Sequence, residues 1–125
     1  MLAVVGPSGS GKSSLLAVCG GLRKPTSGKI HVGDTEITGL DPEQLTRVRR
    51  EKIGFVFQQS HLLPALSVLD QLLLTVHLRG TSPGTAARDR AMGLLQQVGM
   101  DGRSHRRPAE LSGGERQRVG IARAL

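Results

Sequence analysis

The chain has 125 residues, the length of one domain of ordinary size rather than two. Its 17 Lys and Arg residues outnumber the 10 Asp and Glu residues, which gives a formal net charge of +7, and 38% of the residues are hydrophobic, too many for a disordered tail. Two Phe residues are the only aromatic ones, which argues against the base-stacking surfaces of single-strand nucleic-acid binders. One cysteine, Cys19, cannot form an internal disulfide framework, and we expect it to be a small buried hydrophobic residue.

The basic charge has three interpretations that the composition does not separate. It can be a solvated basic face, a surface for polyanions such as nucleotide phosphates or nucleic acid, or the charge of a fragment whose acidic part is missing. No apolar run is long enough to span a bilayer, because the best candidate around residues 69–78 contains Asp70, Gln71 and His77. The first residues do not resemble a signal peptide.

The first half of the chain predicts an α/β arrangement. In chain order we expect a buried strand over residues 2–5, a Gly/Ser loop over 6–11, a helix over 12–22, a hairpin over 28–38, a helix over 41–50 and a buried strand over 53–57. Asp41 as N-cap and Pro42 at the first helical position mark the start of the second helix.

The second half predicts helices alone. Ser67 caps a helix with apolar residues at 69, 72, 73 and 76, and Ser82-Pro83 begins another with an apolar stripe. The Arg-rich interval 103–108 has no periodicity and predicts a solvated loop, and a last helix begins at Ser112. We therefore expect two domains, an α/β core over residues 1–60 and a helical subdomain over 61–125.

Residues 6–13, GPSGSGKS, match the phosphate-binding P-loop pattern between a predicted strand and a predicted helix. Gly9 and Gly11 allow backbone angles that turn successive N–H groups toward one anion, and the following helix adds its positive end. Lys12 supplies a cation for the β- and γ-phosphates, and the Ser13 hydroxyl suits Mg²⁺. The residues assigned to nucleotide binding in this loop are Gly6, Pro7, Ser8, Gly9, Ser10, Gly11, Lys12, Ser13 and Ser14.

Two further motifs resemble a known family. Residues 111–115, LSGGE, followed by RQRVGIARAL, look like the signature motif of ATP-binding-cassette (ABC) proteins, and Val56-Phe57-Gln58 resembles their Q-loop. Taken alone, Ser112 and Glu115 also form an ordinary capping box, and Gln58 could be a surface glutamine that begins a loop. With the P-loop, the three motifs stand in the family's order, and the likeness covers essentially the whole chain.

The resemblance implies a partial RecA-like P-loop NTPase fold, truncated at both ends, that binds ATP and Mg²⁺. By resemblance, Gln58 joins the nucleotide-binding residues and serves the metal with Ser13. The signature residues would contact ATP held in the P-loop of a second subunit, in a head-to-tail dimer; they are Leu111, Ser112, Gly113, Gly114 and Glu115.

The spacing favours a transporter within the family. Gln58 and Leu111 lie 53 residues apart, which is room for a compact helical subdomain and not for the long coiled coils of chromosome-maintenance relatives. We therefore expect the ATP-binding subunit of an ABC transporter, most similar to the lipoprotein-release and macrolide-export type. Such a subunit would be cytoplasmic, peripheral on the cytoplasmic face of the membrane, and paired with transmembrane permease subunits, with no nucleic acid expected.

The alternatives are a non-transport ABC ATPase acting on DNA or ribosomes, and a non-functional fragment. The family pattern continues with an Asp-ending strand, a catalytic Glu and a switch His that this sequence does not contain. We therefore expect the chain alone to hydrolyse ATP slowly or not at all, because general-base assistance is worth about 10²–10⁴ in rate.

Overall fold

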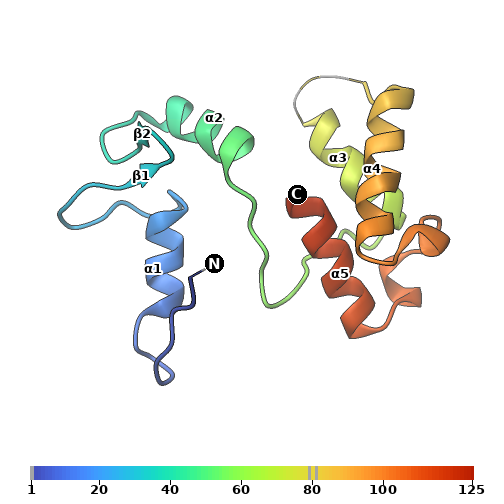
Figure 1. Ribbon diagram of the computed structural model, residues 1–125, viewed down its shortest axis with the longest axis horizontal. Coiled ribbons are helices and arrows are strands. Elements are labelled where there is room, and N and C mark those ends of the chain that lie inside the picture. The colour runs from blue at the N-terminus through green and yellow to red at the C-terminus, as the bar shows by residue number, and fades with distance from the viewer. Residues whose placement is uncertain (1, 79, 81) are drawn as a thin grey trace. The chain divides into compact units, whose positions relative to one another are not determined.

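The computed structural model describes residues 2–78, 80 and 82–125, and it divides into two compact units, Met1–Gly54 and Phe55–Leu125 (Figure 1). The elements in chain order are α1 (Lys12–Cys19), β1 (His31–Val32), β2 (Thr35–Glu36), α2 (Pro42–Lys52), α3 (Val68–His77), α4 (Thr85–Gln97), the 3₁₀ turns η1 (Asp101–Arg103) and η2 (Pro108–Glu110), and α5 (Gly113–Ala124). Among the described residues, no helix combines the length and apolar character that a membrane crossing needs.

The N-terminal unit contains the predicted hairpin and the predicted capped helix. β1 and β2 pair antiparallel with His31 opposite Glu36, and Gly33 turns between them at φ 57°. The Asp41 side chain accepts from the Gln44 N–H at 2.8 Å, and the Gln44 side chain accepts from the Asp41 N–H, so the start of α2 is a complete capping box. The C-terminal half of α2 contacts the turn after α1, because Arg49 Nη1 donates to the Gly21 carbonyl at 3.1 Å.

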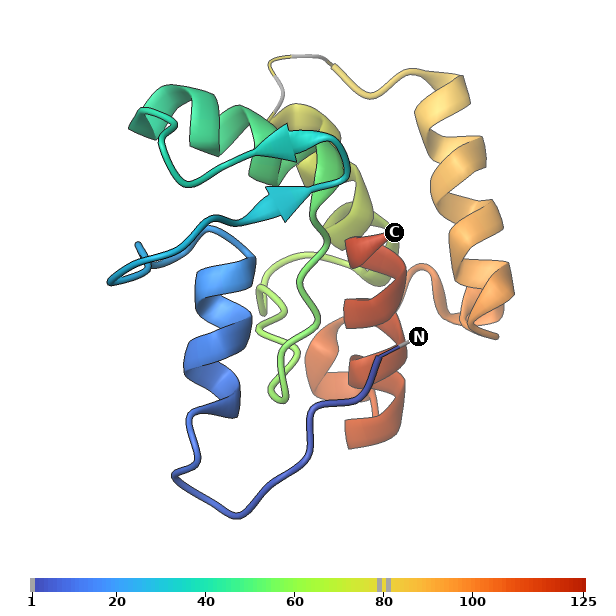
Figure 2. The same cartoon turned by 60° about the vertical axis from the view of Figure 1, so that its left-hand side comes forward.

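The two predicted buried strands, residues 2–5 and 53–57, are not formed in the described structure, and this part of the prediction was wrong. Figure 2 shows the residues before α1 as an irregular tube, and Leu2 and Val5 are 89% and 88% exposed. A parallel strand exists only where a neighbouring strand accepts and donates its backbone hydrogen bonds. Within the described residues, the only sheet is the two-stranded hairpin.

Two smaller expectations about helix α1 also fail. The helix ends at Cys19 rather than at residue 22, because Gly20 follows as C-cap and Gly21 adopts the left-handed φ of 67°. Cys19 is exposed and not a buried hydrophobic residue. The helix that was expected to begin at Ser82 begins later, at Thr85, with Gly84 as its N-cap.

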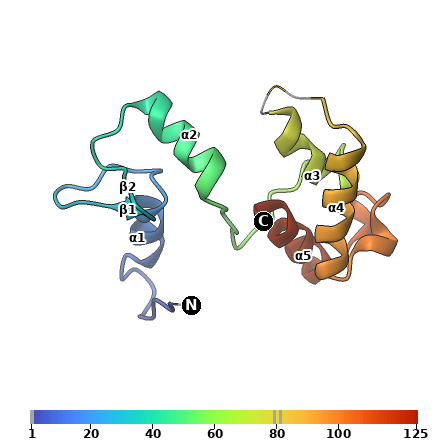
Figure 3. The same ribbon diagram turned by 45° about the horizontal axis from the view of Figure 1, so that its top comes forward.

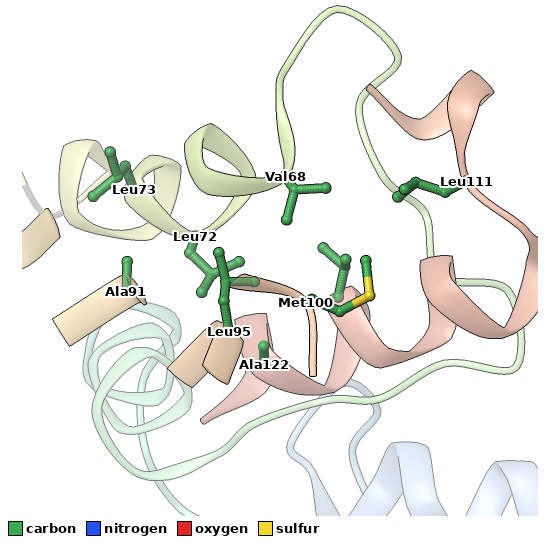
Figure 4. Packing of buried hydrophobic residues seen from close by; sticks show 9 residues of the cluster. Val68, Leu72, Leu73, Ala91, Leu95, Met100, Leu111 and Ala122 are labelled. Carbon is green, nitrogen blue, oxygen red and sulfur yellow. The ribbon is translucent and has the colours of Figure 1, made fainter. Parts of the chain in front are cut away.

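The C-terminal unit packs α3, α4 and α5 around one apolar core (Figures 3 and 4). Its buried members are Val68, Leu72, Leu73, Ala91, Leu95, Met100, Leu111, Val119 and Ala122. The predicted stripe of α3 is present at Leu72 and Leu73, and Val68 extends it by one turn. The first helical residue of α3 is thus part of the core.

The basic loop after α4 has a structural role that the sequence did not indicate. The Arg106 carbonyl accepts from the Val68 N–H at 2.8 Å, and the Ser104 carbonyl accepts from the Leu69 N–H at 2.9 Å. The Ser67 hydroxyl accepts from the Asp70 N–H at 3.2 Å. The first three amides of α3, which no helical carbonyl can satisfy, are therefore all bonded.

Candidate nucleotide site

The predicted phosphate loop curls immediately before α1. Gly9 and Gly11 adopt left-handed φ values of 80° and 85°, which glycine takes at little cost, and Gly11 is the N-cap of α1. No side chain caps this helix, and no described residue accepts a hydrogen bond from the amides of its first three residues, 12–14. These amides and the positive end of the helix dipole are what an anion such as a phosphate binds.

The Lys12 side chain folds back over the loop. Its ammonium donates to the Gly6 carbonyl at 2.8 Å, to the Pro7 carbonyl at 2.6 Å and to the Ser10 hydroxyl at 3.2 Å. A cation is thereby fixed beside the uncapped helix start. Ser13 follows on the first turn of α1 and is exposed, as are the remaining loop residues Ser8 and Ser14.

In the C-terminal unit, the predicted signature turn forms the start of α5. Ser112 is the N-cap, its hydroxyl accepts from the Glu115 N–H at 3.3 Å, and the Glu115 carboxylate accepts from the Ser112 N–H at 2.7 Å. The capping box and the signature motif are therefore the same residues. Gly113 and Gly114 are exposed, and within the described part of the chain no acceptor faces their amides.

Glu115 holds this turn to the loop before it. Its carboxylate lies 2.9 Å from Arg103 Nε in η1. The hydrogen bond from the Ser112 N–H lowers the pKa of Glu115, and the Ser112 hydroxyl and the charges of Arg103 and Arg118 lower this pKa further. The carboxylate is therefore ionised at neutral pH, and its negative charge complements the N-terminus of α5.

Gln58 lies in an irregular segment that packs against α5. Gln58 itself is exposed, and it lines a cleft of about 420 Å³ together with His61, Gly113, Arg116 and Gln117, among other residues. The structure thus brings two of the predicted motifs, the Q-loop and the signature turn, to the same cleft within one unit. The phosphate loop belongs to the other unit and is described by itself.

Sequence reasoning missed three α5 residues that hold the segment around Gln58. Gln117 Nε2 donates to the Phe57 carbonyl at 3.1 Å, and Arg123 donates to the carbonyls of Ser60 and His61. Gly120 lies between them on the helix and packs against Ser60. Their spacing of three residues along one helix face was the available signal, but nothing in the sequence indicates what this face contacts.

Comparison with known proteins identifies the family. A model of the ABC transporter family matches residues 1–125. The lipoprotein-releasing system ATP-binding protein LolD of Idiomarina loihiensis is 50% identical over 125 residues, which are all of this chain and 54% of that protein. The macrolide export ATP-binding/permease protein MacB of Escherichia coli is 46% identical over 125 residues, which are 19% of that protein.

Solved structures agree in fold. The dimeric structure of MJ0796, described as a bacterial ABC transporter cassette, superposes with a TM-score of 0.84 at 43% identity and covers 95% of this chain and 53% of that one. A post-hydrolysis state of the same cassette, bound to ADP and Pi, gives a TM-score of 0.83. The curated MJ0796 sequence comes from Methanocaldococcus jannaschii. The predicted P-loop NTPase fold class is confirmed, and the chain spans about half the length of LolD and MJ0796.

Proposed function

Because the chain belongs to the ABC transporter family, a family of nucleotide-binding proteins, we propose that it forms the Mg²⁺-ATP-binding part of a transporter's ATP-binding subunit. The observation that carries this proposal is the start of α1, where amides without an acceptor among the described residues lie next to a left-handed Gly11 and the Lys12 ammonium. The phosphates of a nucleotide supply the negative charge and the acceptor oxygens that these groups bind.

The chemistry of each residue determines whether it would bind the phosphates or the metal ion. The amides of residues 12–14 and the Lys12 ammonium bind phosphate oxygens, and Lys12 exchanges its carbonyl partners for the β- and γ-phosphates. The Ser13 hydroxyl supplies a neutral oxygen atom of the kind that Mg²⁺ binds together with phosphates and water, and the side-chain carbonyl of Gln58, in the other unit, is a ligand of the same chemical type. When bound, Mg²⁺ neutralises charge on the phosphates.

The signature turn acts on a nucleotide held by a second subunit. Gly113 and Gly114 present their amides at the start of α5, and Ser112 adds a hydroxyl at the same place. Such a turn suits the terminal phosphate of an ATP bound elsewhere, in a head-to-tail dimer of two ATP-binding subunits. The solved structure of the MJ0796 cassette is dimeric, which supports this arrangement.

The partners follow from the relatives. LolD is named as part of a lipoprotein-releasing system and MacB as a macrolide export protein that includes a permease. The subunit that contains this chain would therefore work with a transmembrane permease, peripherally on the cytoplasmic face of the membrane. Substrate selection would belong to the permease.

Calorimetric titration of the chain with Mg²⁺-ATP tests the nucleotide site. Lys12→Ala should weaken binding by about 10- to 100-fold, because a hydrogen bond to a charged group is worth about 1.5–3 kcal/mol. Lys29→Ala is the matched control, since Lys29 lies in the same unit and forms a surface ion pair with Glu36 at 3.3 Å. Equal affinities of Lys12→Ala and the unsubstituted chain would refute the assignment.

A further inference from the structure

We propose that Arg123 is a positioning residue that fixes the backbone of the Gln58 segment, residues 57–61, against α5, and thereby sets where the Gln58 side chain can meet its ligand. The proposal rests on the metal role of Gln58 proposed above. Gln58 and Arg123 lie 65 positions apart in the sequence, and although Arg123 stands in the stretch that follows LSGGE, the motif by itself does not indicate what its side chain contacts.

Arg123 holds two consecutive carbonyls at once. Its Nη2 donates to the Ser60 carbonyl at 2.7 Å, and its Nη1 donates to the His61 carbonyl at 3.1 Å. A planar guanidinium with two parallel N–H groups sets both the position and the orientation of the peptide it binds, which a single contact cannot do. The side chain is part-buried, and burial lowers the pKa of Arg123 while leaving it charged at neutral pH.

Two more residues on the same face of α5 complete the attachment. Gln117 Nε2 donates to the Phe57 carbonyl at 3.1 Å, at the beginning of the segment. Gly120 is buried, and a Cβ placed on it would meet the Ser60 Cβ at the ordinary contact distance of 3.5 Å, so the helix and the segment are separated here by no more than the width of a methyl group. One face of α5 therefore forms a continuous contact surface for the Gln58 segment, made by residues 117, 120 and 123.

The contact with α5 fixes the conformation of the Gln58 segment, because the segment has no regular secondary structure of its own. Residues 53–63 form neither helix nor strand, and His61 has a left-handed φ of 43°. Non-glycine residues adopt this conformation rarely and hold it only where their surroundings determine it. The two hydrogen bonds from Arg123 are placed at this unusual residue and the one before it, three and two positions after Gln58.

A nitroxide label tests the positioning directly, without nucleotide. The label is placed at exposed residue 59 by Gln59→Cys in a Cys19→Ser background, and its mobility is read by electron paramagnetic resonance. Arg123→Lys keeps the charge but loses the paired donors, so the label should become more mobile. Arg118→Gln is the matched control, because Arg118 lies on the same helix and donates to the Met100 sulfur at 3.7 Å, away from the segment. Equal mobility in Arg123→Lys and the unsubstituted background would overturn the proposal.

The affinity for ATP, measured with Mg²⁺ and with a chelator, tests whether Arg123 acts through Gln58. Arg123→Lys should reduce the Mg²⁺-dependent gain in affinity by about tenfold and leave metal-free binding unchanged, as loss of one charge-assisted contact does. In a Gln58→Ala background, Arg123→Lys should cause no further loss. Losses that multiply in the double variant would show a general structural effect and overturn the positioning role. If the unsubstituted chain binds no ATP, the proposed function fails, while the mobility of the label still decides whether Arg123 holds the segment.

Discussion

Gln71 pairs with the backbone of Leu63 through both ends of its side-chain amide. Its Nε2 donates to the Leu63 carbonyl at 2.7 Å, and its Oε1 accepts from the Leu63 N–H at 3.1 Å. Gln71 is fully buried at 0% exposure, in α3 between Asp70 and the core residue Leu72. The same side chain that interrupts the apolar run in the sequence therefore connects the start of the helical unit to its core.

Replacing Gln71 should destabilise the chain. Gln71→Leu removes the partner of the Leu63 N–H and of the Leu63 carbonyl, and two hydrogen bonds of about 0.5–1.5 kcal/mol each are together worth about 1–3 kcal/mol. We expect the free energy of unfolding, measured with urea, to fall by about this amount. Gln97→Leu is the control, because Gln97 is exposed on α4 and a surface substitution changes stability by about 0.5 kcal/mol or less. A loss no larger than that of the control would contradict the pairing.

Gly21 should not tolerate a side chain. It has a φ of 67°, and a Cβ there would lie 2.8 Å from the Leu45 Cδ1, so Gly21→Ala meets both backbone strain and a clash. The strain alone is worth about 1–2 kcal/mol. Gly28→Ala separates the two effects, because Gly28 has a φ of 90° with open space around its Cβ position. In thermal unfolding, Gly21→Ala should therefore lose more stability than Gly28→Ala, and the reverse order would refute the close approach of Gly21 to Leu45 of α2.

Acid should loosen the start of α5. The Ser112 N–H, then the Ser112 hydroxyl, Arg103 and Arg118, hold the pKa of Glu115 below its ordinary value near 4.5. A carboxylate with a lowered folded-state pKa stabilises the fold above its unfolded pKa, and this contribution is lost as the pH falls through the folded one. Stability should therefore decline below about pH 4.5.

The variant Glu115→Gln isolates this effect. It cannot titrate at position 115, so its stability should change less between pH 6 and pH 3 (about the range that spans carboxylate titration) than that of the unsubstituted chain. Glu110 remains in the variant, and the Arg107 N–H and the Arg106 side chain lower its pKa in the same direction. Identical pH profiles for the two proteins would show that Glu115 does not contribute.

The cap of α2 gives a local test in the N-terminal unit. Asp41→Ala removes the acceptor of the Gln44 N–H and should cost about 0.5–2 kcal/mol. Asp41→Asn keeps an N-cap acceptor and should be close to neutral. Chemical denaturation of both variants checks the prediction, and equal losses would mean that charge, not the cap, stabilises the helix.

Features encoded by neighbouring residues were predictable from the sequence. The Asp41 and Ser112 caps, the turn at Gly33 and the left-handed Gly9 and Gly11 all depend on contacts within a few positions, and the structure has each of them. The strands expected over 2–5 and 53–57 depend on neighbours that the local pattern does not contain, and they are not formed. Apolar runs indicate burial, but a strand also requires a partner.

For the candidate site, residue types and spacing predicted a phosphate loop and a signature turn. They could not reveal that Arg123 reaches back to Ser60, because that contact spans 63 positions. Nor could they show that Arg103 meets Glu115 or that the loop after η1 bonds to α3. Such contacts follow from packing in three dimensions, which periodicity along the chain does not encode.

The bonds from Val68 and Leu69 to the carbonyls of Arg106 and Ser104 also constrain the order of folding. During synthesis the chain emerges from its N-terminus, and α3 would leave the ribosome about 35 residues before these acceptors do. The first two amides of α3 therefore have these carbonyl partners only once residue 106 is available. A ribosome pause shortly after α4 would leave both amides to water, and release of the next ten residues would supply their acceptors.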